Sequence, residues 1–310
     1  FSFQNYVRFK SMKKPSKPKI IAIVGQTSSG KSGLAVKLAK KIDGEVISAD
    51  SRQVYKGLNI GSGKITKKEM LGVPHHLLDI ANPKERFTVS MFKELADKAI
   101  GEILARGKVP IICGGTGFYV EAVVKNVLLP DVPVNKKLRK ELSKKTAGQL
   151  FEILKKIDPK RALEIGKQNG IRLIRALEIV KALGQVPPLS HKPIYETLSI
   201  GIETEKDLLK EKIHARLLAR IKDGMIAEAK KLHEKGLSWK RMEELGLEYR
   251  ALARHLREEL TKEEMIEELN REIYQYARRQ AQWFRRDKNI QWFEISEIEK
   301  INSTVKKFLA

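Results

Sequence analysis

The stretch "IIAIVGQTSSGKSGLA" (residues 20–35) decides the fold. It contains the complete pattern of a phosphate-binding loop, with an apolar run typical of a strand before it and a run of helical spacing after it. In such a loop, successive backbone N–H groups point at phosphate oxygens, and a helix N-terminus lies behind them. We therefore expect the loop to bind a diphosphate through Gly25, Gln26, Thr27, Ser28, Ser29, Gly30, Lys31 and Ser32.

The last two residues of this loop carry its specific chemistry. Lys31 adds a mobile positive charge, and the Ser32 hydroxyl is a suitable ligand for Mg²⁺. The loop alone does not say whether the phosphate is transferred, as in a kinase, or leaves with the diphosphate. Residues elsewhere in the chain are needed to distinguish these two chemistries.

Residues 19–127 alternate short apolar runs with helical patterns. We expect strands at 19–25, 44–50 and 108–115, and helices at 32–42 and 89–107. This alternation predicts an α/β fold, with a P-loop parallel-sheet core and flanking helices. Because the carboxyl ends of parallel strands line the ligand crevice, we expect the residues that follow three of these strands to face one another, namely Thr27, Asp50 and Thr116.

The character of the sequence changes between residues 128 and 194, which are punctuated by proline and then helical, without a convincing strand. This predicts a small all-helical insertion domain. A returning strand at 196–203 and a helical pattern over 207–236 follow, and this pattern places six apolar residues on one face: Leu209, Ile213, Leu217, Ile221, Met225 and Leu232. The C-terminal part reads as helical again. The expected domains are a basic lead segment at 1–18, a core with C-terminal helices at 19–127 and 195–310, and the insertion at 128–194.

The bulk composition points to a polyanionic partner. The formal net charge is +23. Such an excess favours binding to a partner that carries a row of phosphates, because the bound cations release counterions from it. A lysine-rich proteome is the alternative explanation. Cys113 is the only cysteine, so the sequence predicts no disulfide, no cysteine-based zinc site and a reducing compartment. No run of eighteen apolar residues occurs, so we expect a cytoplasmic protein without a membrane span.

The first residues of the chain are basic and contain no acid before the first expected strand. Met12, followed by "KKPSKPK", reads as the natural start of a cytoplasmic protein, because residues 1–11 add no recognisable element. A mitochondrial presequence is the competing interpretation, and one arginine in residues 1–19 supports it poorly.

The position of the acidic residue separates the possible chemistries. A P-loop kinase or NTPase usually offers a carboxylate for its metal at the end of a later strand, but here "KVPIIC" ends in Cys113-Gly114-Gly115. The acid lies instead at Asp50, after the second expected strand. A carboxylate there is placed to accept a proton from a nucleophile in the crevice, or it caps the turn.

Seven segments, in their order and spacing, resemble the tRNA dimethylallyltransferase (tRNA isopentenyltransferase) family. They are "GQTSSGKS" (25–32), "ISADSRQVYKGLNIGSGK" (47–64), "PHHLLDI" (74–80), "GGTGFYVEAVV" (114–124), "RLIRALEI" (172–179), "RLLARIKDGMIAEA" (216–229) and "RRQAQWFR" (278–285). The resemblance covers residues 19–295. The single cysteine leaves no room for the C-terminal zinc finger of eukaryotic relatives, which favours the bacterial type.

The resemblance implies an enzyme that transfers the dimethylallyl group of dimethylallyl diphosphate to the N6 amine of the adenosine 3′ of the tRNA anticodon, releasing diphosphate. It implies a flipped adenosine, Mg²⁺ and, we expect, a monomer. Asp50 would bind the amine and accept its proton, and Thr116 would lie near the reacting centre. The diphosphate and its Mg²⁺ would be held by Thr27, Lys31, Ser32 and Arg216. Contacts to the tRNA would come from Asp50, Ser51, Arg52, Gln53, Arg139, Arg172 and Arg175.

Two questions stay open from the sequence: one contact to the tRNA, and the class of function. The chain reads "LGLEYR" (245–250) where many family members have Gly-Tyr-Lys or Gly-Tyr-Arg, so the local tRNA contact is open. A P-loop kinase of a small metabolite, with its acceptor near Asp50, and a nucleic-acid-binding protein switched by a nucleotide are the competing functions. The missing late-strand acid argues against the first, and the "DSRQVY" and "GGTGFY" segments argue against the second.

Overall fold

The computed structural model describes residues 17–188 and 190–310. The chain divides into two compact units, one formed by the residues up to Asn126 and from Pro193 onward, and a smaller one formed by Val127–Lys192. The proposed start at Met12, and all but the last two residues of the expected lead segment, lie outside the described residues.

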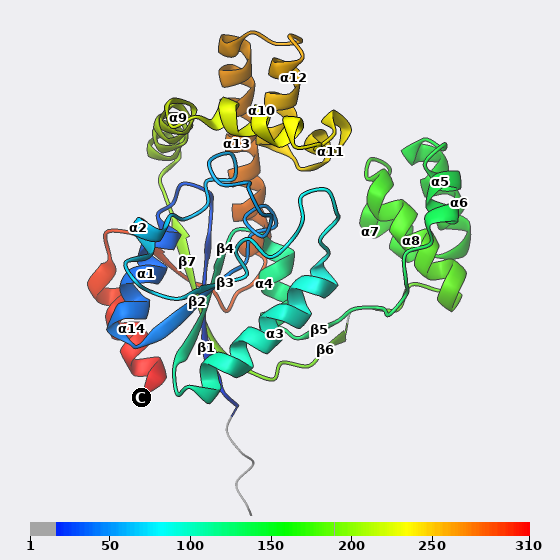
Figure 1. Ribbon diagram of the computed structural model, residues 1–310. Helices are drawn as coiled ribbons and strands as arrows, with labels where there is room; N and C mark the ends of the chain where they lie inside the picture. The colour runs from blue at the N-terminus through cyan, green and yellow to red at the C-terminus, as the bar shows by residue number, and fades with distance from the viewer. Residues whose placement is uncertain (1–16, 189) are drawn as a thin grey trace, which may run out of the picture. The chain divides into compact units, whose positions relative to one another are not determined.

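The larger unit is built on a six-stranded sheet in which every neighbouring pair is parallel (Figure 1). In the order of the sheet, its strands are β3 (His75–His76), β2 (Gly44–Ser48), β4 (Val109–Gly114), β1 (Lys19–Gly25), β7 (Glu196–Glu203) and β8 (Gln291–Glu294). The predicted fold class is confirmed. Strands β3 and β8 were not predicted, and the expectation of a purely helical C-terminal part is wrong at β8.

Helices cover both faces of this sheet because its central strand is apolar on both sides. In β1, Ile21 and Ile23 pack on one face against α1 (Lys31–Lys41) and α14 (Ile298–Leu309). Ile20 and Val24 point the other way, since side chains alternate along a strand, and pack against α3 (Val89–Ala105) and α4 (Gly117–Val124). A fully buried parallel strand explains why the run "IIAIV" shows no polar alternation.

The remaining helices of the larger unit form a separate apolar cluster with the segment around Val54 and Leu58. They are α9 (Lys206–Lys222), α10 (Met225–Glu234), α11 (Trp239–Glu244), α12 (Leu247–Leu256) and α13 (Lys262–Phe284), and the short α2 (Lys67–Met70) precedes β3. The pattern over 207–236 forms two helices rather than one, because Gly224 adopts a left-handed conformation with φ of 99°. Leu209 and Met225 are nevertheless buried, as the apolar face predicts.

The smaller unit has a helical core of its own. Its helices are α5 (Lys136–Leu142), α6 (Ala147–Ile157), α7 (Pro159–Ile165) and α8 (Gly170–Leu183). Phe151, Leu154 and Leu173 are buried at its centre. The prediction that this region contains no strand is wrong in one detail: β5 (Val127–Leu128) pairs antiparallel with β6 (Ser190–His191) where the chain enters and leaves the unit.

None of the helices in residues 17–188 and 190–310 is both long enough and apolar enough to cross a membrane.

Candidate active site

The phosphate-binding loop has the strand–loop–helix context that its sequence predicts. β1 ends at Gly25, whose φ is 146°, and a Cβ there would lie 2.4 Å from the carbonyl oxygen of Ile202. Gly30 precedes α1 with φ of 88°, a conformation that favours glycine. The two glycines let the backbone turn tightly between β1 and α1, so that the N–H groups at the start of α1 face an open pocket.

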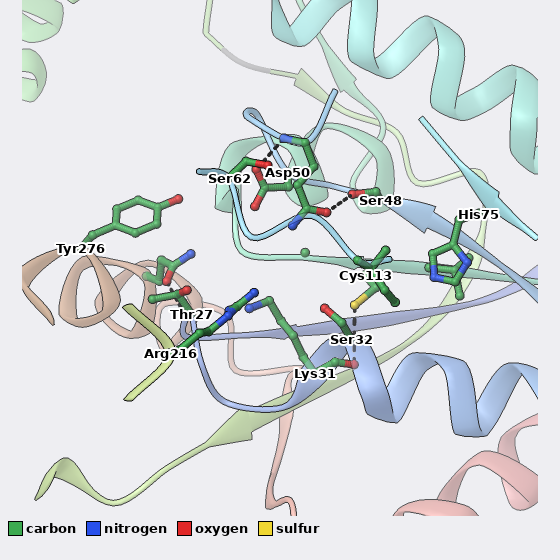
Figure 2. Close-up of a pocket in the computed structure, with 15 residues that line it drawn as sticks. Thr27, Lys31, Ser32, Ser48, Asp50, Ser62, His75, Cys113, Arg216 and Tyr276 are labelled. Atoms are coloured by element: carbon green, nitrogen blue, oxygen red, sulfur yellow. Dashed lines mark hydrogen bonds between the residues drawn. The ribbon is translucent and has the colours of Figure 1, made fainter. Parts of the chain in front are cut away.

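This pocket lies at the carboxyl ends of the central strands (Figure 2). Its walls come from the loop after β1 and the start of α1, β2 and the turn after it, β3, the end of β4, the segment before α2, and helices α9 and α13. Fifteen residues line it: Thr27, Lys31, Ser32, Val46, Ser48, Asp50, Gln53, Ser62, Ile65, His75, Cys113, Gly114, Arg216, Tyr276 and Gln280. The crevice therefore lies where the order of a parallel sheet predicts a ligand site.

Two cations meet in this pocket. Figure 2 shows Lys31 and Arg216 entering from different elements with their charged ends toward each other. Lys31 Nζ donates to the carbonyl oxygen of Gln26 at 2.8 Å, and Arg216 Nη2 donates to that of Gly63 at 2.9 Å. Burial lowers the pKa of Lys31, and the Arg216 charge lowers it further. Within the described residues neither cation has a carboxylate within 4.0 Å, so both remain available to an anion.

The Asp50 carboxylate was expected either to cap a turn or to accept a proton, and its geometry is compatible with both roles. Its Oδ1 accepts hydrogen bonds from the backbone N–H groups of Arg52 at 2.8 Å and Gln53 at 3.3 Å, so it caps the turn after β2. Oδ2 has no hydrogen-bond partner among the described residues, and the side chain lines the pocket that holds Lys31. Asp50 can thus hold the turn with one oxygen and accept a proton with the other.

Of the three turn residues expected to share the crevice, two line the pocket and the third contacts the turn after β2. Thr27 and Asp50 line the pocket, and the Thr116 hydroxyl accepts a hydrogen bond from the Ser51 backbone N–H at 3.0 Å. Thr116 itself is not a lining residue; its oxygen joins the turn after β2 to that after β4.

Two residues of α13 line the pocket although the expected set of site residues did not include them. The buried Gln280 accepts a hydrogen bond from the Thr27 N–H at 2.8 Å and donates to the Gly115 carbonyl at 3.0 Å, so one amide joins two walls of the pocket. Tyr276 lines the pocket, and burial, followed by the Asp50 charge, raises its pKa to about 12. The "RRQAQWFR" motif was a signal for Gln280, but its hydrogen bonds were not predictable from it.

The two histidines of "PHHLLDI" have structural contacts. His76 Nε2 lies 2.7 Å from Oε2 of the buried Glu45, which Arg106 also contacts at 2.7 Å. His75 lines the pocket, but its Nδ1 lies 2.9 Å from the carbonyl oxygen of Val73, and burial is the main cause that lowers its pKa. A neutral His75 with one nitrogen engaged is a wall of the pocket rather than an acid.

The pocket suits Mg²⁺ only as a partner of a diphosphate. No group of three His, Cys, Asp or Glu side chains in residues 17–188 and 190–310 could hold a metal ion by itself. Ser32 offers a hydroxyl, and Asp50 a carboxylate, in the same pocket. Mg²⁺ commonly keeps several waters and takes its other ligands from one or two protein oxygens and substrate phosphates, which this donor set allows.

The remaining nucleotide-binding candidates lie on the turn after β2. The Gln53 amide donates to the Gly63 carbonyl at 3.3 Å, and its Oε1 lies 3.4 Å from Ser48 Oγ. Arg52 donates to the Ser51 carbonyl at 3.3 Å, which keeps its guanidinium at the same turn.

The three arginines of the smaller unit differ from one another. The buried Glu178 accepts from Arg139 Nη2 at 2.7 Å and from Arg175 Nη1 at 2.5 Å. Arg172 is exposed, and its side chain has neither an ion pair nor a hydrogen bond in the part of the chain that the structure describes. Burial raises the pKa of Glu178, but the hydrogen bonds from Arg139 and Arg175 outweigh it and bring the pKa to about 2.

Comparisons with known proteins agree on one family. Family models described as "IPP transferase" and "Isopentenyl transferase" match residues 53–287 and 18–83. The tRNA dimethylallyltransferase of Halalkalibacterium halodurans is 41% identical over 294 residues, which cover 91% of this chain and 93% of that protein.

Two solved structures extend this similarity to the fold. The tRNA isopentenylpyrophosphate transferase of Bacillus halodurans has 40% sequence identity and a TM-score of 0.72, covering 94% of this chain and 97% of that one. A eukaryotic dimethylallyltransferase acting on tRNA has 26% identity and a TM-score of 0.79, covering 94% and 77%.

Proposed function

The chain belongs to the tRNA dimethylallyltransferase family and is a prenyltransferase, and we propose that its donor is dimethylallyl diphosphate. The acceptor in this proposal is the N6 amine of the adenosine 3′ of the anticodon in tRNA. The observation that carries the proposal is that one pocket holds the Asp50 carboxylate and two cations, Lys31 and Arg216, neither of which has a carboxylate within 4.0 Å among the described residues. We also propose that the enzyme is cytoplasmic and acts as a monomer.

The proposed reaction forms one bond and breaks another at the same carbon. The adenosine amine attacks the prenyl carbon, the carbon–oxygen bond to the diphosphate breaks, and the amine loses a proton to Asp50 Oδ2. An exocyclic amine is a weak nucleophile because its lone pair is delocalised into the ring. A carboxylate that orients the amine and accepts its proton as the bond forms therefore lowers the barrier.

The opposite wall of the pocket stabilises the leaving group. Negative charge grows on the departing diphosphate, where the loop N–H groups, Lys31 and Arg216 are fixed donors. Thr27 belongs to this set, since Gln280 holds its backbone in place. When bound with the diphosphate, Mg²⁺ would neutralise phosphate charge, and Ser32 would offer it the protein oxygen.

The acceptor side of the proposal uses the turn after β2 and the smaller unit. Ser51, Arg52 and Gln53 would contact the flipped nucleotide, beside the Thr116 hydroxyl that joins this turn to the next. Arg139, Arg172 and Arg175 would contact the tRNA. Phosphate contacts by such arginines position the RNA, whereas the base is recognised in the pocket.

One assay tests the proposed chemistry against its nearest rival. Unmodified tRNA is incubated with the full chain, Mg²⁺ and dimethylallyl diphosphate labelled in its prenyl carbons, or with ATP labelled in its γ-phosphate. The proposal predicts prenyl label in the RNA at the adenosine 3′ of the anticodon, and no transfer of phosphate. Transfer of phosphate to RNA or to a small metabolite, without prenyl label, would replace it by a kinase.

A further inference from the structure

One short loop beside the pocket has six of its ten backbone polar groups bonded to side chains from distant helices. It comprises residues 59–63 ("NIGSG"), and we call it the 59–63 loop. Ser62, which lines the pocket, lies on it. The residues that hold it, on α9, α10 and α12, are more than 150 positions further along the chain.

Glu228 on α10 is the centre of this arrangement. Its Oε2 accepts hydrogen bonds from the N–H groups of Asn59 at 3.0 Å and Ile60 at 2.8 Å. Its Oε1 accepts from the N–H of Gly61 at 2.9 Å and from the hydroxyl of Tyr249 at 2.8 Å. Three successive backbone N–H groups around one carboxylate form an anion-binding nest, which here is filled by the chain's own side chain.

The packing around the nest fixes its position. Tyr249 is 1% exposed, and a Cβ on Gly61 would lie 2.6 Å from its hydroxyl oxygen, so nothing larger than glycine fits there. Arg220 on α9 donates from Nε to the Ile60 carbonyl at 2.8 Å and from Nη2 to the Gly61 carbonyl, and it also pairs with Glu248. In this chain, Glu248 and Tyr249 of the unusual "LGLEYR" segment therefore support the loop.

The loop transmits this support to the pocket through one atom. The carbonyl oxygen of Gly63 accepts hydrogen bonds from Arg216 Nη2 at 2.9 Å and from Gln53 Nε2 at 3.3 Å. Under the proposed function, Arg216 serves the diphosphate and Gln53 the flipped nucleotide. A shift of the Gly63 carbonyl would therefore move groups of both substrate sites together, although Glu228 touches neither.

From this geometry we propose that Glu228 is a positioning residue for the transfer reaction, acting through the 59–63 loop on Arg216 and Gln53. The inference rests on the proposed function for the identity of the two substrates. Misplacing reacting groups by about 1 Å can lower a rate by about 10²-fold, and a loop that keeps its other bonds would move by less. We expect kcat/KM to fall about tenfold when Glu228 loses its charge.

The test uses Glu228→Gln, which keeps the shape of the side chain. Whichever way the amide is turned, its NH₂ group faces two hydrogen-bond donors, so the nest cannot stay intact. Glu272→Gln is the matched control, because Glu272 pairs with Arg250 at 2.7 Å on the helix surface and has no contact with the loop. The probes are Mg²⁺ with inorganic diphosphate, titrated by calorimetry, and steady-state prenyl transfer with each substrate varied.

We expect Glu228→Gln to weaken diphosphate binding about tenfold and to raise the KM for both substrates more than it lowers kcat, while Glu272→Gln behaves as wild type. A double-mutant cycle on diphosphate binding separates positioning from general destabilisation. In an Arg216→Ala background, Glu228→Gln should weaken diphosphate binding by less than about twofold, because the group it positions is gone. Tyr249→Phe removes one of the four hydrogen bonds and should lower kcat/KM about threefold without lowering Tm markedly.

Wild-type diphosphate binding and wild-type kinetics in Glu228→Gln would overturn the inference, as would losses that multiply fully in the double variant. Should Glu228→Gln be too unstable to purify, Tyr249→Phe with unchanged kinetics would overturn it in the same way. An enzyme that transfers no prenyl group would contradict the proposed function instead. The diphosphate titrations would still decide the role of Glu228 in that case, since they need no turnover.

Discussion

The pocket of the larger unit and the arginines of the smaller unit contain similar basic residues in opposite electrostatic settings. In the pocket, Lys31 and Arg216 donate only to backbone carbonyls. In the smaller unit, Arg139 and Arg175 pair with Glu178, whose side chain is 1% exposed. A cation on a carbonyl keeps its charge for an incoming anion, whereas a cation on a buried carboxylate has its charge largely compensated. The type of partner thus separates groups suited to catalysis from groups suited to holding the fold.

The largest effect that follows from this comparison is expected at Lys31. Lys31→Ala should lower kcat by roughly 10²–10³, the loss typical when one fixed donor to a developing negative charge is removed. Binding of the prenyl diphosphate should fall less, because the charge is greatest in the transition state. Single-turnover transfer and equilibrium binding measure the two losses, with the exposed Lys37→Ala on the same helix as control. Equal losses in both would mean that Lys31 serves uniform binding.

The second effect concerns the paired arginines. Arg139→Ala removes two hydrogen bonds from the buried Glu178 and should destabilise the smaller unit by about 1–3 kcal/mol. Hydrogen exchange of peptides from residues 136–183, followed by mass spectrometry, measures this locally. Unchanged protection, together with weaker tRNA binding, would contradict the structural role and show that Arg139 acts mainly on RNA.

The third effect is a pH dependence confined to the smaller unit. In the folded protein the hydrogen bonds from Arg139 and Arg175 lower the pKa of Glu178 to about 2, below its ordinary value of 4.5. The stability that it contributes is therefore fully present above about pH 4.5 and is lost as the pH falls toward 2. Hydrogen exchange of residues 136–183 between pH 5 and pH 3 should show protection falling with pH in the wild type and falling less in Glu178→Gln. The same slope in both proteins would assign the acid sensitivity to other groups.

The smallest effect is expected at Arg172, the exposed arginine whose side chain has no ion pair or hydrogen bond to any residue that the structure describes. Arg172→Ala should leave stability unchanged, weaken tRNA binding and reduce the slope of log affinity against log salt by about one. The sequence predicts the same slope change at Arg139 and Arg175. Because both arginines pair with Glu178, replacing either of them should also destabilise the smaller unit, which replacing Arg172 should not. An Arg172→Ala slope equal to that of the wild type would remove this residue from the RNA-binding surface.

The central part of the fold was predictable because its signals are local. The P-loop, the apolar run of β1 and the strand at 196–203 each appear within about ten residues of sequence. The strands that were missed in the six-stranded sheet are two and four residues long and lie at its two edges. The break at Gly224 was missed because the apolar spacing continues across it, while the backbone turns.

The role of a site residue was predictable where a sequence motif indicates it. It was not predictable where the side chain hydrogen-bonds to backbone groups far away in the sequence. Thr27, Asp50, Lys31 and Arg216 meet as expected. Gln280 and Glu228 lie within the quoted motifs at 278–285 and 216–229, but their roles were missed because most of their partners are backbone groups more than 160 positions away, which no local pattern reveals.

The central claim is that Asp50 accepts the proton of the attacking amine while Lys31 and Arg216 stabilise the departing diphosphate. The most direct measurement is the single-turnover rate of prenyl transfer by Asp50→Asn, with tRNA and Mg²⁺ saturating. Asparagine keeps an acceptor oxygen for the turn but cannot serve as the base, so we predict a loss of roughly 10²–10⁴ in rate with little change in tRNA affinity. A rate within about tenfold of wild type would contradict the claim and leave Asp50 as the cap of its turn.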